Sequence, residues 1–113
     1  MDELFKALGD ENRLRILHLL VHRELCVCEI EEILQTTQSN ASRHLTKLKL
    51  AGVIACNKKA QWVYYHIHPE FKSAHSSLYK YLREKQETGA IYQKDLKTLQ
   101  VFNKKQENCK TLV

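Results

Sequence analysis

The stretch from Leu25 to Gly52 constrains the fold of this chain more than any other. It reads LCVCEIEEILQTTQSNASRHLTKLKLAG. A Cys-x-Cys pair, Cys26 and Cys28, opens a short segment with the apolar spacing of a helix. A polar turn follows, and then a second helical segment carries serines, an asparagine and an arginine on one face. This layout predicts a thiol site built onto the first helix of a DNA-reading helix-turn-helix.

Charge is unevenly placed along the chain. The window between Ile33 and Pro69 contains no Asp or Glu, but it contains five of the 18 Lys and Arg residues. The other 13 basic residues balance the 13 acidic ones, so the net charge of +5 belongs wholly to this window. A basic excess of this kind is expected of a surface that faces phosphates, and the alternative is a solvated basic face without a ligand.

The length and the cysteine content narrow the class of protein. The 113 residues fit one domain, and no run approaches the 18 apolar residues of a membrane-spanning helix. The acidic start, Met1-Asp2-Glu3, lacks the layout of a secretory signal, so we expect a cytoplasmic protein with no membrane partner. Four cysteines at irregular spacing in a reducing compartment indicate thiols or metal ligands rather than a disulfide framework.

Apolar spacing predicts four helices up to Gly52. Asp10 is placed to cap the second helix by accepting a hydrogen bond from a free backbone N–H. Gly52 is placed to end the fourth helix, because glycine accepts the left-handed conformation found at many helix ends. In that helix Ala41, Leu45 and Leu48 form the buried stripe. The expected ranges are 4–8, 11–21, 27–35 and 38–51.

The polar face of the fourth predicted helix has the composition of a DNA-reading surface. Its first half offers compact hydrogen-bonding groups for base edges, and its second half offers cations for phosphates. A helix that enters a major groove needs that arrangement. The candidate DNA-contacting residues of this helix are Gln38, Ser39, Asn40, Ser42, Arg43, Thr46 and Lys47.

A basic β-hairpin is predicted next. Val53–Cys56 and Trp62–Ile67 are rich in β-branched and aromatic residues, and the segment between them has the length of a hairpin loop. Lys58 and Lys59 lie at its tip, so the hairpin would form a two-stranded wing that reaches the DNA backbone or minor groove. The tip carries Ala60 and no glycine, which leaves its turn geometry open.

The C-terminal third is predicted to be helical. From Pro69 an apolar stripe has the narrow spacing of a helix that pairs with a partner helix. A last helix of mixed charge is too polar for a core, so we expect it to pack across a dimer or to remain partly mobile. The expected fold is α+β, mainly α: a winged helix-turn-helix dimer domain with a dimerisation helix, 1–86, and a C-terminal helical tail, 87–113. The stripe consists of Phe71, His75, Leu78 and Leu82.

The spacing of Cys26 and Cys28 limits how their sulfurs can meet. Residues two apart on an ideal helix point about 200° apart, so two thiolates of a regular helix cannot converge on one ion. They can converge if Leu25 to Cys28 is extended or if the first helical turn is unwound. Binding an ion would then distort the start of the helix that supports the recognition helix, so DNA and ion would weaken each other's binding.

The ligand chemistry of two thiols favours a soft ion. Thiolates prefer thiophilic species over Mg2+ or Ca2+. A closed zinc site needs four ligands, whereas a pyramidal three-coordinate species such as arsenite or antimonite needs fewer. The alternative at this point is that both cysteines are small buried hydrophobes.

Three motifs together resemble a known family. ELCVCEI, the S-x-x-S-R-H-L-x-x-L helix and the WVYY strand are similar to the arsenical-resistance repressors of the ArsR/SmtB family, over about Leu4 to Leu82. The resemblance implies a winged helix-turn-helix dimer that represses metal-resistance operons and leaves DNA when the ion binds. It also implies that Cys26 and Cys28 are the inducer-binding thiols. The residues that match the DNA-reading helix are Ser39, Asn40, Ser42, Arg43 and His44.

The resemblance leaves the third ligand of the ion open. Some members carry a third cysteine one helical turn further on, where this chain has Glu31. Cys109, Cys56 or a solvent ligand could serve, and we rank Cys109 first because a tail can move. The cadmium and lead sensors of the family use cysteines of an N-terminal arm that this chain lacks, and the zinc sensors use a histidine set of which only His75 has a counterpart.

The leading hypothesis is a homodimeric repressor of double-stranded operator DNA that arsenite or antimonite releases. The alternatives are a repressor that responds to thiol oxidation and a sensor of another soft ion such as cadmium or lead. A protein-interaction module on the same fold predicts weak DNA affinity that is insensitive to sequence. A thiol enzyme is disfavoured, because the chain has only three glycines, no phosphate-cradling loop and no base paired with the thiols. We therefore expect neither catalytic residues nor a catalytic cofactor.

Overall fold

The computed structural model describes the backbone of residues 2–105 and the side chains of residues 3–102. Most of the described chain is helical, and its short strands form one sheet. No helix within this part is long and apolar enough to cross a membrane. In chain order the elements are α1 (Asp2–Leu8), α2 (Glu11–His22), β1 (Leu25–Cys26), α3 (Val27–Leu34), α4 (Gln38–Leu50), β2 (Ile54–Lys59), β3 (Trp62–Ile67), α5 (Pro69–Ala74), α6 (Ser76–Thr88) and α7 (Ala90–Lys105).

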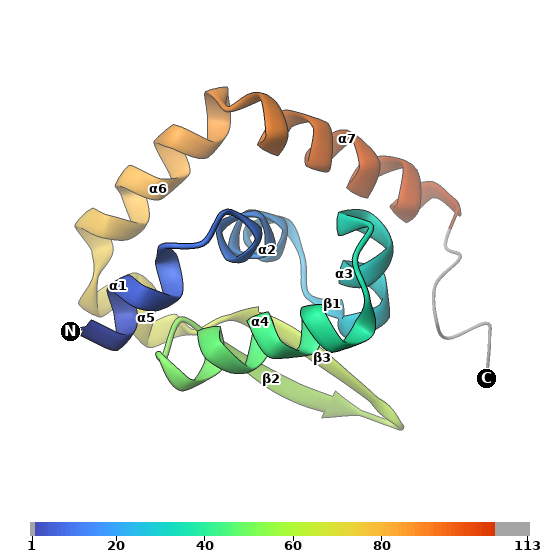
Figure 1. Cartoon of the computed structure of the whole chain (residues 1–113), viewed down its shortest axis with the longest axis horizontal. Coiled ribbons are helices and arrows are strands. Elements are labelled where there is room, and N and C mark those ends of the chain that lie inside the picture. Colours follow the sequence, from blue (N-terminus) through green and yellow to red (C-terminus); the bar gives the residue numbers. More distant parts are fainter. Residues whose placement is uncertain (1, 106–113) are drawn as a thin grey trace.

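Helix α2 lies at the centre of the molecule. Figure 1 shows α6 and α7 forming an arc on one side of it, with the β2–β3 hairpin and α4 on the other. Helices α1, α3, α4 and α7 all pack against α2, and its residues Ile16, Leu17 and Leu19 are at most 1% exposed. The elements of the helix-turn-helix are therefore positioned by contacts with this one buried helix.

The local signals that predicted α2 and α4 are confirmed. Asp10 caps α2, with its side chain accepting hydrogen bonds from the backbone N–H groups of Asn12 (2.8 Å) and Arg13 (3.2 Å). Thr37 caps α4 by accepting from Asn40 N–H at 3.2 Å. Gly52 follows α4 with φ +79°, in the left-handed region expected there. The buried stripe of α4 consists of Ala41, Leu45 and Leu48, together with His44.

The sheet has one strand more than the predicted wing. Its order is β1-β3-β2, and Leu25 and Cys26 of β1 pair with Tyr65 and Tyr64 of β3. Two residues are too few to show the alternation by which a strand is recognised, and β1 gains its hydrogen bonds only from the distant β3. The wing hairpin itself is confirmed, and its turn places Ala60 at φ +56°.

The C-terminal third differs from the prediction in two respects. The expected single helix from Pro69 is broken at His75 (φ −123°, ψ 46°) into α5 and α6. The last helix, α7, packs against α2 and α3 of its own chain, with Leu99 only 2% exposed, so it is not too polar for a core; its packing across a dimer stays a prediction. Its polarity was misleading because Asp95, 2% exposed, is buried with a partner, Arg15 of α2. The division at residue 86 stays a prediction, and Cys109 lies outside the described residues.

Candidate thiol centre and nucleic-acid interface

The two sulfurs of the Cys-x-Cys pair lie 3.9 Å apart. Cys26 is extended (φ −91°, ψ 168°) and is the N-cap of α3, while Cys28 lies in the first turn of that helix. The extended backbone before the helix therefore brings the sulfurs together, which is one of the two arrangements predicted. Since the approach needs no unwinding of α3, the expected distortion of the helix start is not required for convergence.

The separation of the sulfurs suits a shared ion. Two sulfurs that each lie about 2.3 Å from one ion can be at most about 4.6 Å apart, and 3.9 Å falls within that limit. Cys26 is 2% exposed and Cys28 is half-buried, so an ion would approach the two sulfurs from the side of Cys28. Among the described residues, no group of three or more His, Cys, Asp or Glu could hold a metal, so this part of the chain would offer an ion no more than the two sulfurs.

A wholly buried carboxylate supports Cys26. Glu29, 0% exposed, accepts a hydrogen bond from Cys26 N–H at Oε1 (2.9 Å) and one from Arg23 Nη2 at Oε2 (3.1 Å). In return Cys26 Sγ accepts from Glu29 N–H, which completes a capping box with sulfur in the place of the usual hydroxyl. The Cys26 sulfur, which would bind an ion, is thus hydrogen-bonded to the backbone of the first turn of α3.

The environment of Cys26 favours the neutral thiol. Burial raises the pKa of the Cys26 thiol, and the negative charge of Glu29 raises it as well, whereas the hydrogen bond from Glu29 N–H acts in the opposite direction. Since metals and metalloids bind the thiolate, ion binding at Cys26 would release a proton.

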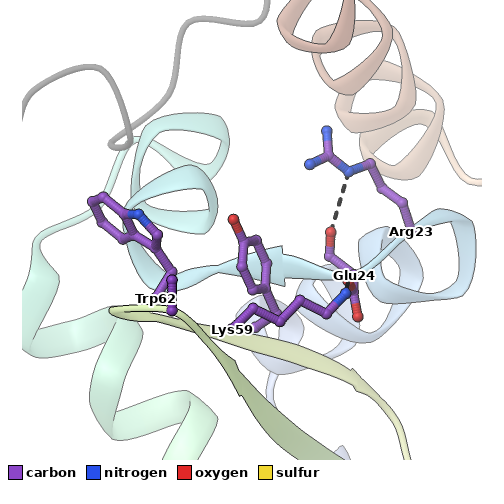
Figure 2. Close-up of a pocket in the computed structure, with 6 residues that line it drawn as sticks. Arg23, Glu24, Lys59 and Trp62 are labelled. Carbon is purple, nitrogen blue, oxygen red and sulfur yellow. Dashed lines mark hydrogen bonds and ion pairs between the residues drawn. The ribbon is translucent and has the colours of Figure 1, made fainter.

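Two aromatic side chains of β3 adjoin the thiol pair. Tyr64, 5% exposed, forms a small apolar cluster with Cys26, and Cys28 and Trp62 pack against that cluster. The same two rings line a surface pocket of about 530 Å3 (Figure 2). Its other wall carries Arg23, whose Nε donates to the carbonyl of Glu24 at 3.1 Å. The site therefore lies beside the tip half of the wing, where Trp62 pairs with Lys59 and Tyr64 with Asn57, in a cluster separate from the main core.

Cys56 does not share the face of the sheet that carries Cys26. Residues paired across neighbouring strands point to the same side, and successive residues alternate. Cys26 pairs with Tyr64, whereas Cys56 pairs with Tyr65. The Cys56 thiol is therefore on the opposite face of the sheet, which disfavours it as the third ligand.

The predicted DNA-reading face of α4 is exposed. Arg43 Nη2 donates to Asn40 Oδ1 at 3.1 Å, which holds the guanidinium on that face. The absence of acidic residues there leaves the positive charge of the helix uncompensated. Contact with DNA by these residues stays a prediction. The exposed residues of this face are Gln38, Ser39, Asn40, Ser42, Arg43, Thr46 and Lys47.

The two lysines of the wing tip differ in their surroundings. Lys58 and Lys59 are both exposed. Lys59 points toward Glu24, with which it forms an ion pair (Figure 2), and its ammonium group lies over the Tyr64 ring, 5.5 Å from the centroid. Of the two lysines, Lys58 is therefore the better placed to bind a phosphate, because Lys59 would first have to break its ion pair with Glu24.

His44 is placed differently from the rest of the predicted DNA-reading residues. It is 6% exposed, and its Nδ1 lies 3.2 Å from Arg13 Nη1 of α2. Its position could have been read from the sequence, because it lies three residues after Ala41 and four before Leu48 on the buried stripe. His44 therefore belongs to the underside of the recognition helix, where it contacts the rest of the protein.

Two supporting residues were missed by sequence reasoning. Glu29 follows Cys26 at the spacing of a capping box, which is a readable signal once cysteine is allowed in the first position. No comparable signal marks Arg23, because its partner is found only when the chain turns from α2 into α3.

Known regulatory proteins are similar to this chain in sequence. Residues 10–55 match the family described as "Bacterial regulatory protein, arsR family". The chain is 46% identical over 68 residues to the arsenic resistance transcriptional regulator ArsR1 of Pseudomonas putida, covering 59% of this chain and 53% of that protein. It is 50% identical over 64 residues to the cadmium resistance transcriptional regulatory protein CadC of Listeria innocua, covering 56% and 54%. The matches thus span about half the length of these curated relatives.

A solved structure extends the likeness to the fold. The homodimeric winged helix-turn-helix DNA-binding domain of a Mycobacterium bovis protein, described as a possible ArsR-family transcriptional regulator, matches with a TM-score of 0.64 and 27% identity. The match covers 74% of this chain and 78% of that domain. These relatives are transcriptional regulators and not enzymes, in agreement with the expectation drawn from the sequence. The chain is 41% identical over 70 residues to the arsenical resistance operon repressor of Bacillus subtilis, covering 61% of this chain and 67% of that protein. With the family match, this shows that the chain belongs to the arsR family of bacterial regulatory proteins.

Proposed function

We propose that this protein is a homodimeric repressor of operator DNA that is released when arsenite or antimonite binds Cys26 and Cys28. The observation that carries the proposal is the 3.9 Å contact between the two sulfurs, at the point where β1 of the wing sheet meets α3 of the helix-turn-helix. A pair of sulfurs at this junction adjoins the wing, which would touch DNA, and α3, which packs against the recognition helix α4. The arsenic and cadmium resistance regulators among its relatives support the choice of a soft inducer.

The DNA-binding half of the proposal rests on α4 and the wing. The exposed face of α4 carries short polar groups and cations, and Lys58 extends the positive surface to the wing tip. Short groups suit base edges in a major groove, and the cations suit phosphates. The homodimeric state of the solved relative supports binding to two half-sites.

A three-coordinate metalloid requires one ligand beyond the thiol pair. We propose Cys109 for this role. Helix α7 packs against α3, the helix that Cys26 and Cys28 open, and Cys109 follows Lys105 by four residues. Four residues span at most about 14 Å, so Cys109 can lie no further than this from the end of α7 at Lys105.

The coupling between ion and DNA runs through Cys26. Its backbone pairs with Tyr64 of the wing strand β3, and its sulfur accepts the N–H of Glu29 in α3. An ion on that sulfur competes for the electron pair that the N–H uses and pulls on both neighbours. Because Cys26 joins the wing to the helix-turn-helix, we infer that the ion-bound form binds DNA less tightly and that DNA weakens ion binding by the same factor.

The test is a titration of the DNA-bound full chain. The probe is a fluorescent duplex that the protein has selected from a random-sequence pool, followed by anisotropy as arsenite, antimonite, cadmium, lead or zinc is added. Release by arsenite or antimonite at the lowest concentration supports the proposal. Cys26→Ser with Cys28→Ser should keep DNA affinity and lose the response, whereas Cys56→Ser, a thiol on the other face of the sheet, should keep both. Cys109→Ser should lower the sulfur count around bound arsenic in X-ray absorption from three to two.

A repressor that responds to thiol oxidation is the second candidate function. The 3.9 Å contact that suits an ion also places two sulfurs within reach of a common oxidant. A disulfide between residues two apart is strained, so oxidation would join one of them to another cysteine. The titration with peroxide in place of arsenite decides between the candidates. Release by peroxide alone would end the metalloid proposal, and release by cadmium alone would replace its ion.

A further inference from the structure

We propose that Arg13 and a neutral His44 form a positioning pair that holds the recognition helix α4 in place against α1 and α2. This inference rests on the proposed DNA binding, but neither residue is assigned a contact with DNA. It gives His44 a role that differs from the base or phosphate contact predicted from the sequence.

One guanidinium joins three helices. Arg13 belongs to α2, and its Nε donates to the carbonyl of Ala7 at 2.7 Å while its Nη2 donates to the carbonyl of Lys6 at 3.2 Å. Both carbonyls lie in the last turn of α1, where backbone acceptors have no partner within the helix. The remaining Nη1 lies 3.2 Å from His44 Nδ1 of α4. The Arg13 side chain is 12% exposed, and its contacts with Ala7 and His44 are partly buried, whereas its bond to Lys6 is exposed.

The pair fixes the protonation state of His44. A guanidinium only donates hydrogen bonds, so Nδ1 of His44 must present its lone pair and the ring proton must be on Nε2. Protonating Nδ1 would set an N–H against an N–H and place two positive charges 3.2 Å apart. The contact is therefore available only to one tautomer of the neutral ring.

The surrounding charges favour that neutral ring. Burial lowers the pKa of His44, and the positive charges of Arg13, Arg43 and Lys47 lower it further, whereas the carboxylate of Asp10 raises it. Helix α1 faces the pair with backbone carbonyls, which are bonded to the guanidinium. At neutral pH the imidazole is thus held in the form that the pair needs.

The position of His44 on α4 makes the pair relevant to DNA binding. Its neighbours Ser42 and Arg43 are exposed on the opposite face of the same helix. Groups that read base edges must be placed to within about 0.5 Å, so a small movement of the buried face shifts the exposed one out of register. His44 would therefore act on DNA affinity without touching DNA.

The first test needs no DNA. In the full chain labelled with nitrogen-15, imidazole nitrogen shifts and couplings identify the tautomer of each histidine, and His44→Asn identifies the signals of His44. We expect a neutral ring with its proton on Nε2 at neutral pH, and Arg13→Gln should abolish that preference. A proton on Nδ1, or a cationic ring at neutral pH, overturns the pair. This result stands whether or not the proposed repressor function holds.

The second test measures DNA affinity against pH with the selected duplex. His44→Asn places a neutral amide oxygen near the position of Nδ1, so it should keep affinity within about threefold at neutral pH. Wild-type affinity should decline as the pH falls below 6.5, the ordinary pKa of histidine, and the variant should lack that decline. His22→Asn, an exposed histidine at the other end of α2, is the matched control and should keep the wild-type profile.

Direct contact and positioning give different results in this experiment. His44→Ala should lower affinity by about tenfold or more, and neither His44 variant should change the salt slope, because no phosphate contact is lost. A salt slope reduced by about one in His44→Asn, or an acid profile parallel to that of the wild type, would overturn the proposal. If His44→Ala fails to fold, His44→Asn and the imidazole spectra still decide. If the wild type binds no selected duplex, the repressor proposal fails and the spectra alone judge the pair.

Discussion

The two ends of α2 hold the helix-turn-helix by opposite electrostatic means. At the C-terminal end Arg23 contacts the carboxylate of Glu29 in α3, which is 0% exposed. At the N-terminal end Arg13 contacts the imidazole of His44 in α4, which is 6% exposed. The first contact joins two opposite charges, whereas the second joins a charge to a neutral acceptor.

The difference determines how each end can fail. Removing one partner at the C-terminal end leaves the other charge without its counter-charge. An uncompensated charge of this kind lowers the stability of the fold more than replacing both partners does. At the N-terminal end, adding a proton to His44 is enough, because it turns an acceptor into a like charge. The contact between Arg23 and Glu29 is therefore expected to be sensitive to substitution, and the contact between Arg13 and His44 is expected to be sensitive to acid.

The largest effect is expected for Glu29→Ala. The substitution leaves the buried N–H of Cys26 without its acceptor and Arg23 without its carboxylate, so the free energy of unfolding should fall by about 3 kcal/mol. Urea unfolding followed by circular dichroism measures the change. Glu32→Ala, an exposed glutamate of the same helix, is the control and should change stability by less than about 0.5 kcal/mol. A loss below about 1 kcal/mol for Glu29→Ala would show that the two ends do not differ as described.

A smaller effect is expected at the middle of α2. Arg15 donates to both carboxylate oxygens of Asp95 in α7, at 2.8 and 2.9 Å, and Asp95 is 2% exposed. Arg15→Ala should lower the free energy of unfolding by about 2 kcal/mol and speed amide exchange in α7. Lys97→Ala, which removes an exposed charge of α7, should do neither. Fast exchange in α7 of the wild type would mean that this ion pair does not attach the helix.

The acid sensitivity of the N-terminal end gives the third prediction. Burial is the main cause that lowers the pKa of His44, and likewise of His18 in the middle of α2. A lowered folded-state pKa means that the unfolded chain takes up protons first. The associated stability is therefore complete above pH 6.5, the ordinary histidine value, and is lost as the pH falls through the folded-state pKa. Urea unfolding at a series of pH values should show this loss, and His44→Asn should reduce it. An unchanged pH dependence in the variant would remove His44 from the account.

Features of the fold that depend on residues close in the sequence could be predicted from the sequence, and features that depend on distant residues could not. The caps Asp10 and Gly52 and the apolar stripe of α4 depend on residues within a few positions, and they were predicted correctly. The strand β1 and the packing of α7 depend on partners far along the chain, such as Asp95 and Arg15, and they were not. A buried charge looks like a surface residue until its distant partner is known.

The candidate site divides in the same way. The exposed face of α4 follows from its helical period, and the Cys-x-Cys motif itself is visible in the sequence. The approach of Cys26 and Cys28 to 3.9 Å depends on the extended backbone of Cys26, which the pairing of β1 with β3 imposes. The burial of His44 follows from the same period, although the resemblance of the S-x-x-S-R-H-L-x-x-L helix placed this residue among those that read DNA.

The smallest effect is expected when both ends of α2 are changed together. Arg13 and Arg23 are ten residues apart, about 15 Å along a helix, and they share no partner among the residues that the structure describes. The stability losses of Arg13→Ala and Arg23→Ala should therefore add to within about 0.5 kcal/mol in the double variant. Urea unfolding of the four proteins measures the sum, and Arg13→Lys with Arg23→Lys serves as a cycle that keeps both charges.

Additivity at the two ends bears on how an ion could reach the DNA-binding surface. If the ends are independent without an inducer, α2 is a rigid support, and a signal from the thiols must travel through β1 into the wing or through α3 into α4. Repeating the cycle with arsenite bound then distinguishes a passive α2 from a moving one. A coupling energy above about 1 kcal/mol that appears only with arsenite would mean that the ion shifts α2 itself and thereby loosens the contact between Arg13 and His44.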